Sequence, residues 1–295
     1  MKKKFHCIGI VGRPRDSRDF ITHEILYIWL VSQGYQVIVD DQIAKELKLK
    51  SINIATLSEI GSLCDLAIVI GGDGNMLGAS RVLSCYSTKI IGINKGQLGF
   101  LTDLNFDTIF QELSNILSGE YILENRFTLD MTILSKFVHC KNGKAVNEVV
   151  LHSEKVAHMI EFEVYIDKKL AFSQRSDGLI ISTPTGSTGY SLSAGGPILS
   201  TSLEAIVLVP MFPHTLSARP LVISNNSTIL LKFLNIHHKL KVSCDSQIIF
   251  SVEVEDMVLI RKSVDFIKFI HPVQYNYFDM LSKKLNWYHK SINSK

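Results

Sequence analysis

The feature that most constrains the fold is a series of short apolar runs that alternate with amphipathic segments over the first third of the chain. Largely apolar runs at 7–12, 37–39, 66–70 and 89–93 are separated by segments with helical spacing, of which 16–33 is the longest. Continuous apolar strands that alternate with helices are typical of a parallel sheet covered on both faces. The sequence therefore predicts an α/β domain at the N-terminus.

The pattern changes after about residue 124, where apolar and polar residues begin to alternate one by one. The clearest case is 159–166, and similar segments recur at 228–234, 239–244, 247–252, 257–261 and 265–270. Several such strands, each with one buried face, indicate two packed sheets. We therefore expect a Rossmann-like α/β nucleotide-binding domain over 1–123, an all-β dinucleotide-binding β-sandwich over 124–273, and a tail, 274–295, that packs back on the first domain.

Composition argues against several classes of protein. The net charge is only +3, and the one dense basic run is Lys2-Lys3-Lys4, which is too little for a nucleic-acid-binding surface. No apolar stretch approaches the roughly 18 residues of a membrane span, so no membrane partner is expected. The five cysteines are scattered without a C-x-x-C pair, which argues against zinc clusters and disulfides and favours a reducing, cytoplasmic compartment.

The first chemical motif is Gly71-Gly72-Asp73-Gly74-Asn75, which follows an apolar run and opens a helix. Ligands of open α/β sheets bind beyond the carboxyl ends of the strands, and a helix N-terminus offers N–H groups to phosphate. A carboxylate repels phosphate unless a divalent cation or a proton transfer involves it, so Asp73 is a candidate base or metal-linked group. The spacing matches neither the P-loop nor the dinucleotide-binding fingerprint.

The second chemical motif is 183–197, which consists mostly of Gly, Ser, Thr and Pro and directly follows an apolar run. Densely spaced backbone amides and hydroxyls suit a phosphate or a ribose, and Tyr190 suits packing against a base or ring. No G-x-S-x-G elbow is present, so hydrolase chemistry lacks its nucleophile.

A third pattern is Asn147-Glu148, an amide and a carboxylate side by side between apolar residues. Such a pair could hold ribose hydroxyls, although a strand end with two exposed polar residues is the more common case. The ten histidines show no H-E-x-x-H or comparable spacing, so no direct protein ligand to a metal is assigned.

Taken together and in this order, five segments closely resemble the NAD kinase family: 71–75, 94–101, 147–148, 175–178 and 183–197. The similarity extends over nearly the whole chain. The G-G-D-G element is also similar to the nucleotide loop of diacylglycerol kinases and phosphofructokinases, and the long Thr/Gly/Ser segment is what separates NAD kinases from them.

The resemblance implies transfer of the γ-phosphoryl group of ATP to the 2′-hydroxyl of the adenosine ribose of NAD, giving NADP, with Asp73 as the general base. It also implies a divalent metal ion, Mg²⁺ or Mn²⁺, and a homo-oligomer, either dimer or tetramer. The implied ATP phosphate loop is Gly71, Gly72, Gly74 and Asn75. The implied NAD-binding residues are Asp73, Gly74, Asn147, Glu148, His158, Arg175, Asp177, Thr188, Gly189, Tyr190, Ser191, Leu192, Ser193 and Gln247.

Three positions depart from the family pattern. Gly189 stands where alanine is commoner, and Lys95 and Gln97 replace the more usual Arg and Asn. Two alternative functions remain open from the residues alone. One is a lipid or sugar kinase with the same G-G-D-G loop, and the other is a non-catalytic NAD(P)-binding sensor, against which Asp73 argues.

Overall fold

The computed structural model describes residues 4–13, 20–94, 99–105, 108–135, 140–155, 158–234, 239–253 and 255–287. Lys95 and Gln97 lie outside these residues. The chain divides into two compact units, Met1–Asn125 with Ile267–Lys295, and Arg126–Phe266. The first boundary falls two residues after the one expected at 123, and the C-terminal segment of the first unit begins at Ile267 rather than at residue 274.

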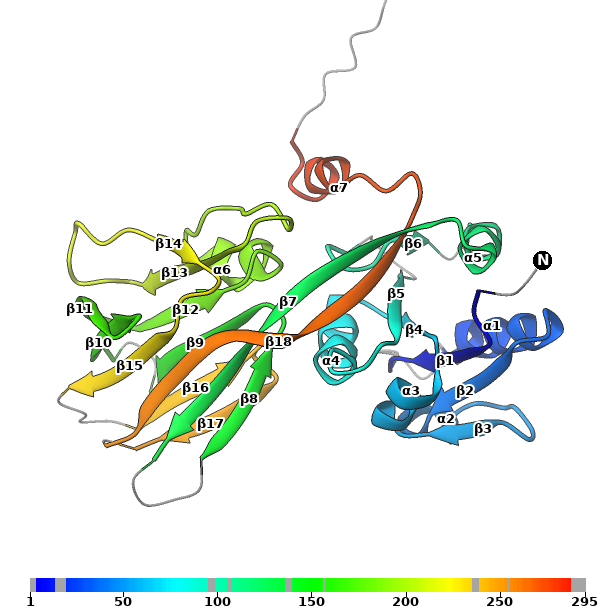
Figure 1. The fold of residues 1–295 in the computed structure, drawn as a ribbon, viewed down its shortest axis with the longest axis horizontal. Coiled ribbons are helices and arrows are strands. Elements are labelled where there is room, and N and C mark those ends of the chain that lie inside the picture. Colours follow the sequence, from blue (N-terminus) through cyan, green and yellow to red (C-terminus); the bar gives the residue numbers. More distant parts are fainter. Residues whose placement is uncertain are drawn as a thin grey trace, which may run out of the picture. The chain divides into compact units, whose positions relative to one another are not determined.

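The first unit is built around a parallel sheet with the strand order β18-β5-β4-β1-β2-β3, and β6 pairs with β5 (Figure 1). Its strands are β1 (Cys7–Val11), β2 (Gln36–Asp40), β3 (Asn53–Ala55), β4 (Leu66–Ile70), β5 (Lys89–Asn94), β6 (Leu104–Asn105) and the end of β18 (Met257–Pro272). Its helices are α1 (Ile21–Ser32), α2 (Asp41–Ala44), α3 (Leu57–Leu63), α4 (Asp73–Leu83), α5 (Ile109–Ser118) and α7 (Tyr277–Lys284).

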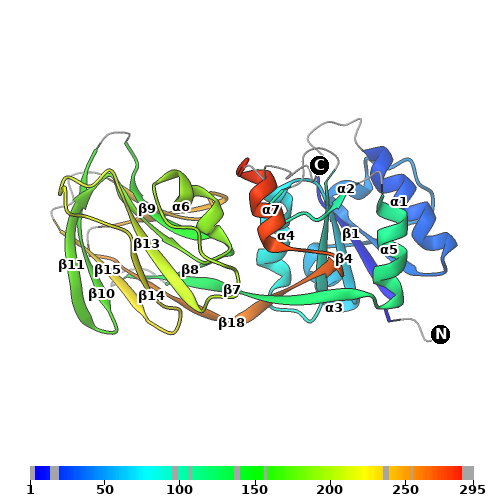
Figure 2. The same ribbon diagram turned by 90° about the horizontal axis from the view of Figure 1, so that it is seen from above.

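The sheet is covered on both faces because its strands are apolar on both faces. On one face, Ile8 and Ile10 of β1 share a buried cluster with residues of α1 and α5, which lie side by side in Figures 1 and 2. On the other face Gly9 lies against Ile60 of α3, and a Cβ at Gly9 would overlap that side chain. The predicted parallel α/β architecture is confirmed.

One local prediction in this unit was wrong. The apolar spacing over 43–49 predicts a short helix, but α2 ends at Ala44, so Ile43 is buried from the helix and Leu47 from the residues that follow it. The short elements β3 and α3 were not predicted. A reciprocal capping box, in which Thr56 and Glu59 exchange side-chain and backbone hydrogen bonds, starts α3.

The second unit is a sandwich of two sheets, as predicted. One sheet joins β11-β10-β15-β18 with β7 and β8, and the other has the order β14-β13-β12-β9-β16-β17. The strands are β7 (Tyr121–Leu134, which begins in the first unit), β8 (Lys141–Ala145), β9 (Glu148–Ser153), β10 (Ile160–Ile166), β11 (Lys169–Ser176), β12 (Gly178–Ser182), β13 (Ala205–Met211), β14 (Leu221–Ser224), β15 (Ile229–Leu234), β16 (Leu240–Cys244) and β17 (Ile248–Val252). Leu129 and Phe162 of the first sheet share one buried cluster with Val149, Leu179 and Val242 of the second.

β18 is one strand of 16 residues, not the two strands expected at 257–261 and 265–270. Lys262 and Ser263 between these segments interrupt the apolar alternation in the sequence, but the backbone of β18 stays paired with β7, so the strand continues. Among the described residues, no helix is long and apolar enough to cross a membrane.

Candidate active site

The glycine-rich loop after β4 takes a shape that only glycine fits at its first position. Gly71 has a φ of +143° and donates its N–H to the carbonyl oxygen of Ile93, 2.9 Å away. A Cβ on Gly71 would overlap the side chain of Asn75, whose Nδ2 donates to the carbonyl oxygen of Arg13 at 2.8 Å. Asn75 therefore fixes the loop, which is a structural role beside its implied place at a phosphate.

The N-terminus of α4 is open. Gly72 is the N-cap residue, and no side chain caps this end of the helix. A Cβ added at Gly72 or Gly74 would meet nothing within 4 Å. An uncapped helix N-terminus with free space around it can bind an anionic phosphate through backbone N–H groups and the helix dipole.

Asp73 is the first residue of α4, and its half-buried carboxylate is held in one orientation by the backbone of a neighbouring loop. Phe100 N–H donates to Oδ2 at 2.9 Å, and Leu101 N–H donates to Oδ1 at 3.1 Å. Gly99 lies so close that a Cβ there would overlap the carboxylate. An ionised carboxylate offers about four lone-pair positions, so Asp73 can still accept a proton from a substrate hydroxyl.

In the second unit, a second carboxylate lies at the start of β9. Glu148 is only 4% exposed. The backbone N–H groups of Val146, Asn147 and Glu148 donate hydrogen bonds of 2.8–3.2 Å to the carboxylate of Asp245. The more common case of two exposed polar residues at a strand end is therefore wrong here, since Asp245 ties this end of the strand into the core.

Several buried polar atoms in this unit have no protein partner. Among the described residues, Asn147 Oδ1, Glu148 Oε2 and Ser191 Oγ are buried without a hydrogen bond. A Cβ at Gly189 would lie 3.3 Å from Asn147 Nδ2 and 3.6 Å from Glu148 Oε2. Buried polar groups are almost always paired in native proteins, so this cluster is suited to the hydroxyl groups of a ligand.

Burial raises the pKa of Glu148 to about 8, and the negative charge of Asp245 contributes to the same shift. At neutral pH the side chain therefore exists largely as the neutral acid in the unliganded chain. Such a group can donate a hydrogen bond as the acid and accept one as the carboxylate.

The segment 183–197 folds into a 3₁₀ turn, Gly186–Thr188, and a short helix, α6 (Tyr190–Ser193). Its first hydroxyls hold the segment itself. Thr183 Oγ1 donates to the carbonyl oxygen of Val146 at 2.7 Å, and Ser187 Oγ donates to that of Pro184 at 2.6 Å. These two hydroxyls are therefore engaged within the protein.

Two glycines of this segment provide a matched stability test. We expect Gly186→Ala to destabilise the chain by about 1–3 kcal/mol, because its Cβ would overlap the carbonyl oxygen of Asn147. Gly189→Ala should change stability by less than about 1 kcal/mol, since its closest contacts of 3.3 Å require only a small adjustment. Urea denaturation of both variants measures the difference, and equal destabilisation would contradict the described packing.

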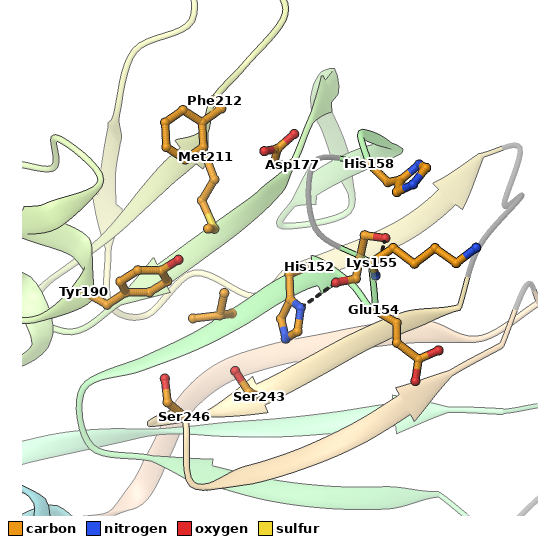
Figure 3. Close-up of a pocket in the computed structure, with 12 residues that line it drawn as sticks. His152, Glu154, Lys155, His158, Asp177, Tyr190, Met211, Phe212, Ser243 and Ser246 are labelled. Carbon is orange, nitrogen blue, oxygen red and sulfur yellow. Dashed lines mark hydrogen bonds between the residues drawn. The ribbon is translucent and has the colours of Figure 1, made fainter.

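A cavity of about 470 Å³ opens in the second unit (Figure 3). Its lining residues are Val150, His152, Ser153, Glu154, Lys155, His158, Asp177, Tyr190, Met211, Phe212, Ser243 and Ser246. His158, Asp177 and Tyr190 are brought together here, as the resemblance implied for a dinucleotide. The other lining residues come from β9, β13 and β16 and from the residues that follow these strands, none of which carries a recognisable motif, so they were not predicted.

His152 is the most informative of these additional residues. Its Nδ1 lies 2.8 Å from the carbonyl oxygen of Ser153, so Nδ1 carries the proton (Figure 3). In the neutral ring Nε2 is then a hydrogen-bond acceptor. The sequence signal was a histidine near the end of an otherwise apolar strand, which periodicity alone does not distinguish from a surface residue.

Of the implied NAD-binding residues, His158, Asp177 and Tyr190 line this cavity and the others do not. Arg175 is exposed on β11, with its Nε 3.7 Å from a carboxylate oxygen of Glu161. Gln247 is exposed in the β16–β17 turn, directly after Asp245 and Ser246, both of which have positive φ. Thr188, Leu192 and Ser193 lie on the turn and α6 beside Tyr190, outside the cavity lining.

Comparison with known proteins identifies the family over nearly the whole chain. Residues 8–121 match the model of the ATP-NAD kinase N-terminal domain, and 146–272 match that of the C-terminal domain. The chain is 63% identical over 287 residues to the NAD kinase of Buchnera aphidicola subsp. Schizaphis graminum, covering 97% of this chain and 98% of the relative. It is 59% identical to the NAD kinase of Escherichia coli O7:K1, with the same two coverages.

Solved structures agree on the fold. The yeast NADH kinase complexed with NADH superposes with a TM-score of 0.86 at 24% identity, covering 98% of this chain and 90% of that one. An NAD kinase from Archaeoglobus fulgidus in complex with ATP gives a TM-score of 0.74 at 25% identity, covering 96% and 100%.

The α/β unit with its open glycine loop and the β-sandwich with its cavity define a two-domain nucleotide-dependent kinase. The chain belongs to the ATP-NAD kinase family. The function predicted from the motifs, phosphoryl transfer to NAD, is confirmed, and neither a lipid or sugar kinase nor a non-catalytic sensor is favoured.

Proposed function

We propose that Asp73 is the general base in the transfer of the γ-phosphoryl group of ATP to the 2′-hydroxyl of the adenosine ribose of NAD. The observation that carries this role is the orientation of its carboxylate by the N–H groups of Phe100 and Leu101. Asp73 would take the hydroxyl proton as the ribose oxygen bonds to the γ-phosphorus and the bond to the bridging oxygen of ADP breaks. The open N-terminus of α4 would hold the phosphates through backbone N–H groups.

The second unit would hold the dinucleotide. Asn147 and Glu148 would bond the ribose hydroxyls, because both have a buried side-chain oxygen without a protein partner. Tyr190, His158 and Asp177 would contact the rest of the dinucleotide in the cavity. A ring packed on Tyr190 fits an apolar cavity that has a few polar groups on its wall.

A divalent ion, Mg²⁺ or Mn²⁺, would accompany ATP. No group of three His, Cys, Asp or Glu residues in the described part of the chain could hold a metal by itself. This composition fits an ion bound mainly through triphosphate oxygens, as Mg²⁺ commonly is. When bound, the ion would neutralise charge on the phosphates.

We also propose that the chain works in the cytoplasm as a homo-oligomer. All five cysteines are free thiols, which fits a reducing compartment. The oligomer rests on resemblance to the family.

The direct test is formation of NADP by the purified chain from NAD, ATP and Mg²⁺, read with an NADP-specific dehydrogenase. Diacylglycerol and hexose phosphates serve as competing acceptors. NADP formation with no turnover of the other acceptors is expected. A folded chain that leaves NAD unchanged would contradict the proposal.

A further inference from the structure

We propose that Asp103 and Glu124, with the buried His271 between them, form a positioning triad that fixes the carboxylate of Asp73 for catalysis. The inference rests on the proposed role of Asp73 as the base. None of the three residues belongs to a motif of the family resemblance.

The imidazole of His271 is buried between two carboxylates, of which that of Glu124 is 23% exposed. The side chain of His271, near the end of β18, is 5% exposed, and that of Asp103 is 9% exposed. His271 Nδ1 bonds to Asp103 Oδ2, and Nε2 lies 2.9 Å from Oε2 of Glu124 on β7. Tyr275 stacks on the imidazole at 4.0 Å between ring centroids, with 14° between the planes.

An ionised carboxylate can only accept hydrogen bonds, so with Asp103 and Glu124 both ionised each ring nitrogen of His271 is a donor. The imidazole is then charged, and it is held in one plane by two carboxylates and one aromatic ring. Charge-assisted hydrogen bonds of this kind fix geometry more firmly than neutral ones.

The segment 99–105 connects this triad to Asp73. Phe100 and Leu101 donate their N–H groups to the Asp73 carboxylate, and Thr102 Oγ1 accepts the N–H of Gly99 at 2.9 Å. Asp103 follows directly and is anchored to His271. A shift of Asp103 would therefore move the two amides that orient the base.

Energetics favour a positioning role over a purely stabilising one. Burying a histidine with two carboxylates costs desolvation energy, and well-packed apolar residues in such places often give equal or greater stability. The next residue after Asp103 is Leu104 in β6, which is buried and apolar and pairs with Ile93 of β5. The polar triad thus holds Asp103, and with it the segment whose N–H groups bond to the carboxylate of Asp73.

Two substitutions of His271 separate its two hydrogen bonds. The amide nitrogen of asparagine occupies roughly the place of Nδ1, and that of glutamine roughly the place of Nε2. His271→Asn can therefore keep the bond to Asp103, whereas His271→Gln can keep only the bond to Glu124. Both variants should lose thermal stability, because each leaves one buried carboxylate less well paired.

The expected result is a difference in kcat. His271→Gln should lower kcat on the order of 10-fold or more, and His271→Asn should stay within about 3-fold of the parent chain, since only the former releases Asp103. KM for NAD should change little in either variant. A purely structural role would instead give equal kcat values once the folded fraction is taken into account, and that result would overturn the inference.

A second pair covers the case in which either histidine variant fails to fold. Asp103→Asn and Glu124→Gln keep the shape of each side chain and remove its charge. Asp103→Asn should lower kcat more than Glu124→Gln, and equal values would likewise overturn the inference. If the parent chain forms no NADP, the proposed function fails and the inference falls with it; if only these variant comparisons fail, the proposed function stands.

Discussion

Asp73→Asn is expected to give a folded chain that still binds NAD but forms NADP roughly 10²- to 10⁴-fold more slowly, which is the range for losing a general base. The amide is nearly the same size as the carboxylate but cannot take the proton of the ribose hydroxyl. It also places an N–H₂ group against the N–H of Phe100 or Leu101, so one of the two orienting hydrogen bonds is lost. The measurements are kcat for NADP formation and calorimetric binding of NAD.

Asp279→Asn is the matched control. Asp279 is an exposed first-turn residue of α7, as Asp73 is a first-turn residue of α4, so both substitutions remove a charge from a helix N-terminus. The control should keep the parent rate. Near-normal turnover in Asp73→Asn, or an equal loss in the control, would remove Asp73 from the role of base.

Glu148→Gln is expected to weaken NAD binding and to stabilise the unliganded chain at alkaline pH. Glu148 is largely neutral at pH 7, and a hydrogen bond between neutral groups contributes about 0.5–1.5 kcal/mol, so the dissociation constant for NAD should rise about 2- to 10-fold. Weaker NAD binding together with higher stability distinguishes a residue that holds the ligand from one that only supports the fold.

The stability effect follows from linkage. The pKa of Glu148 rises from 4.5 in the unfolded chain to about 8 in the folded one, mainly through burial and then through Asp245. The folded chain therefore holds a proton that the unfolded chain releases between these values. The stability that this group contributes is complete below about pH 4.5 and is lost as pH rises through about 8.

Glutamine stays neutral at all pH values, so Glu148→Gln should remove this loss and raise the melting temperature most clearly at pH 8–9. Thermal unfolding from pH 5 to 9 gives the comparison, with Glu204→Gln, an exposed glutamate, as control. If the melting temperature of Glu148→Gln at alkaline pH lies below that of the parent chain, the buried carboxylate stabilises the fold, and the expectation is contradicted.

The main architecture was predictable because it follows from long, regular patterns. Continuous apolar runs such as 66–70 mark strands buried on both faces, and strict alternation such as 159–166 marks one buried face. Short elements were not predictable in this way. α3 has only seven residues, and its one clear signal was the Thr56-x-x-Glu59 capping box.

The candidate site was predictable only where local chemistry was dense. The glycine loop and the Thr/Gly/Ser segment were visible as composition, but the burial of Glu148 depends on Asp245, which is 97 positions away in the sequence. The cavity lining draws on side chains from β9, β13 and β16, whose spatial proximity results from sheet order. Contacts between strands that are distant in the sequence cannot be recognised from a short stretch of residues.

The position of the transferred phosphoryl group tests the account most directly. Phosphorus NMR of the product from NAD, ATP and Mg²⁺ should show one new phosphomonoester on the 2′-oxygen of the adenosine ribose, formed by the parent chain and nearly absent with Asp73→Asn. A phosphoryl group on any other hydroxyl, or the same product at the same rate from Asp73→Asn, would contradict it.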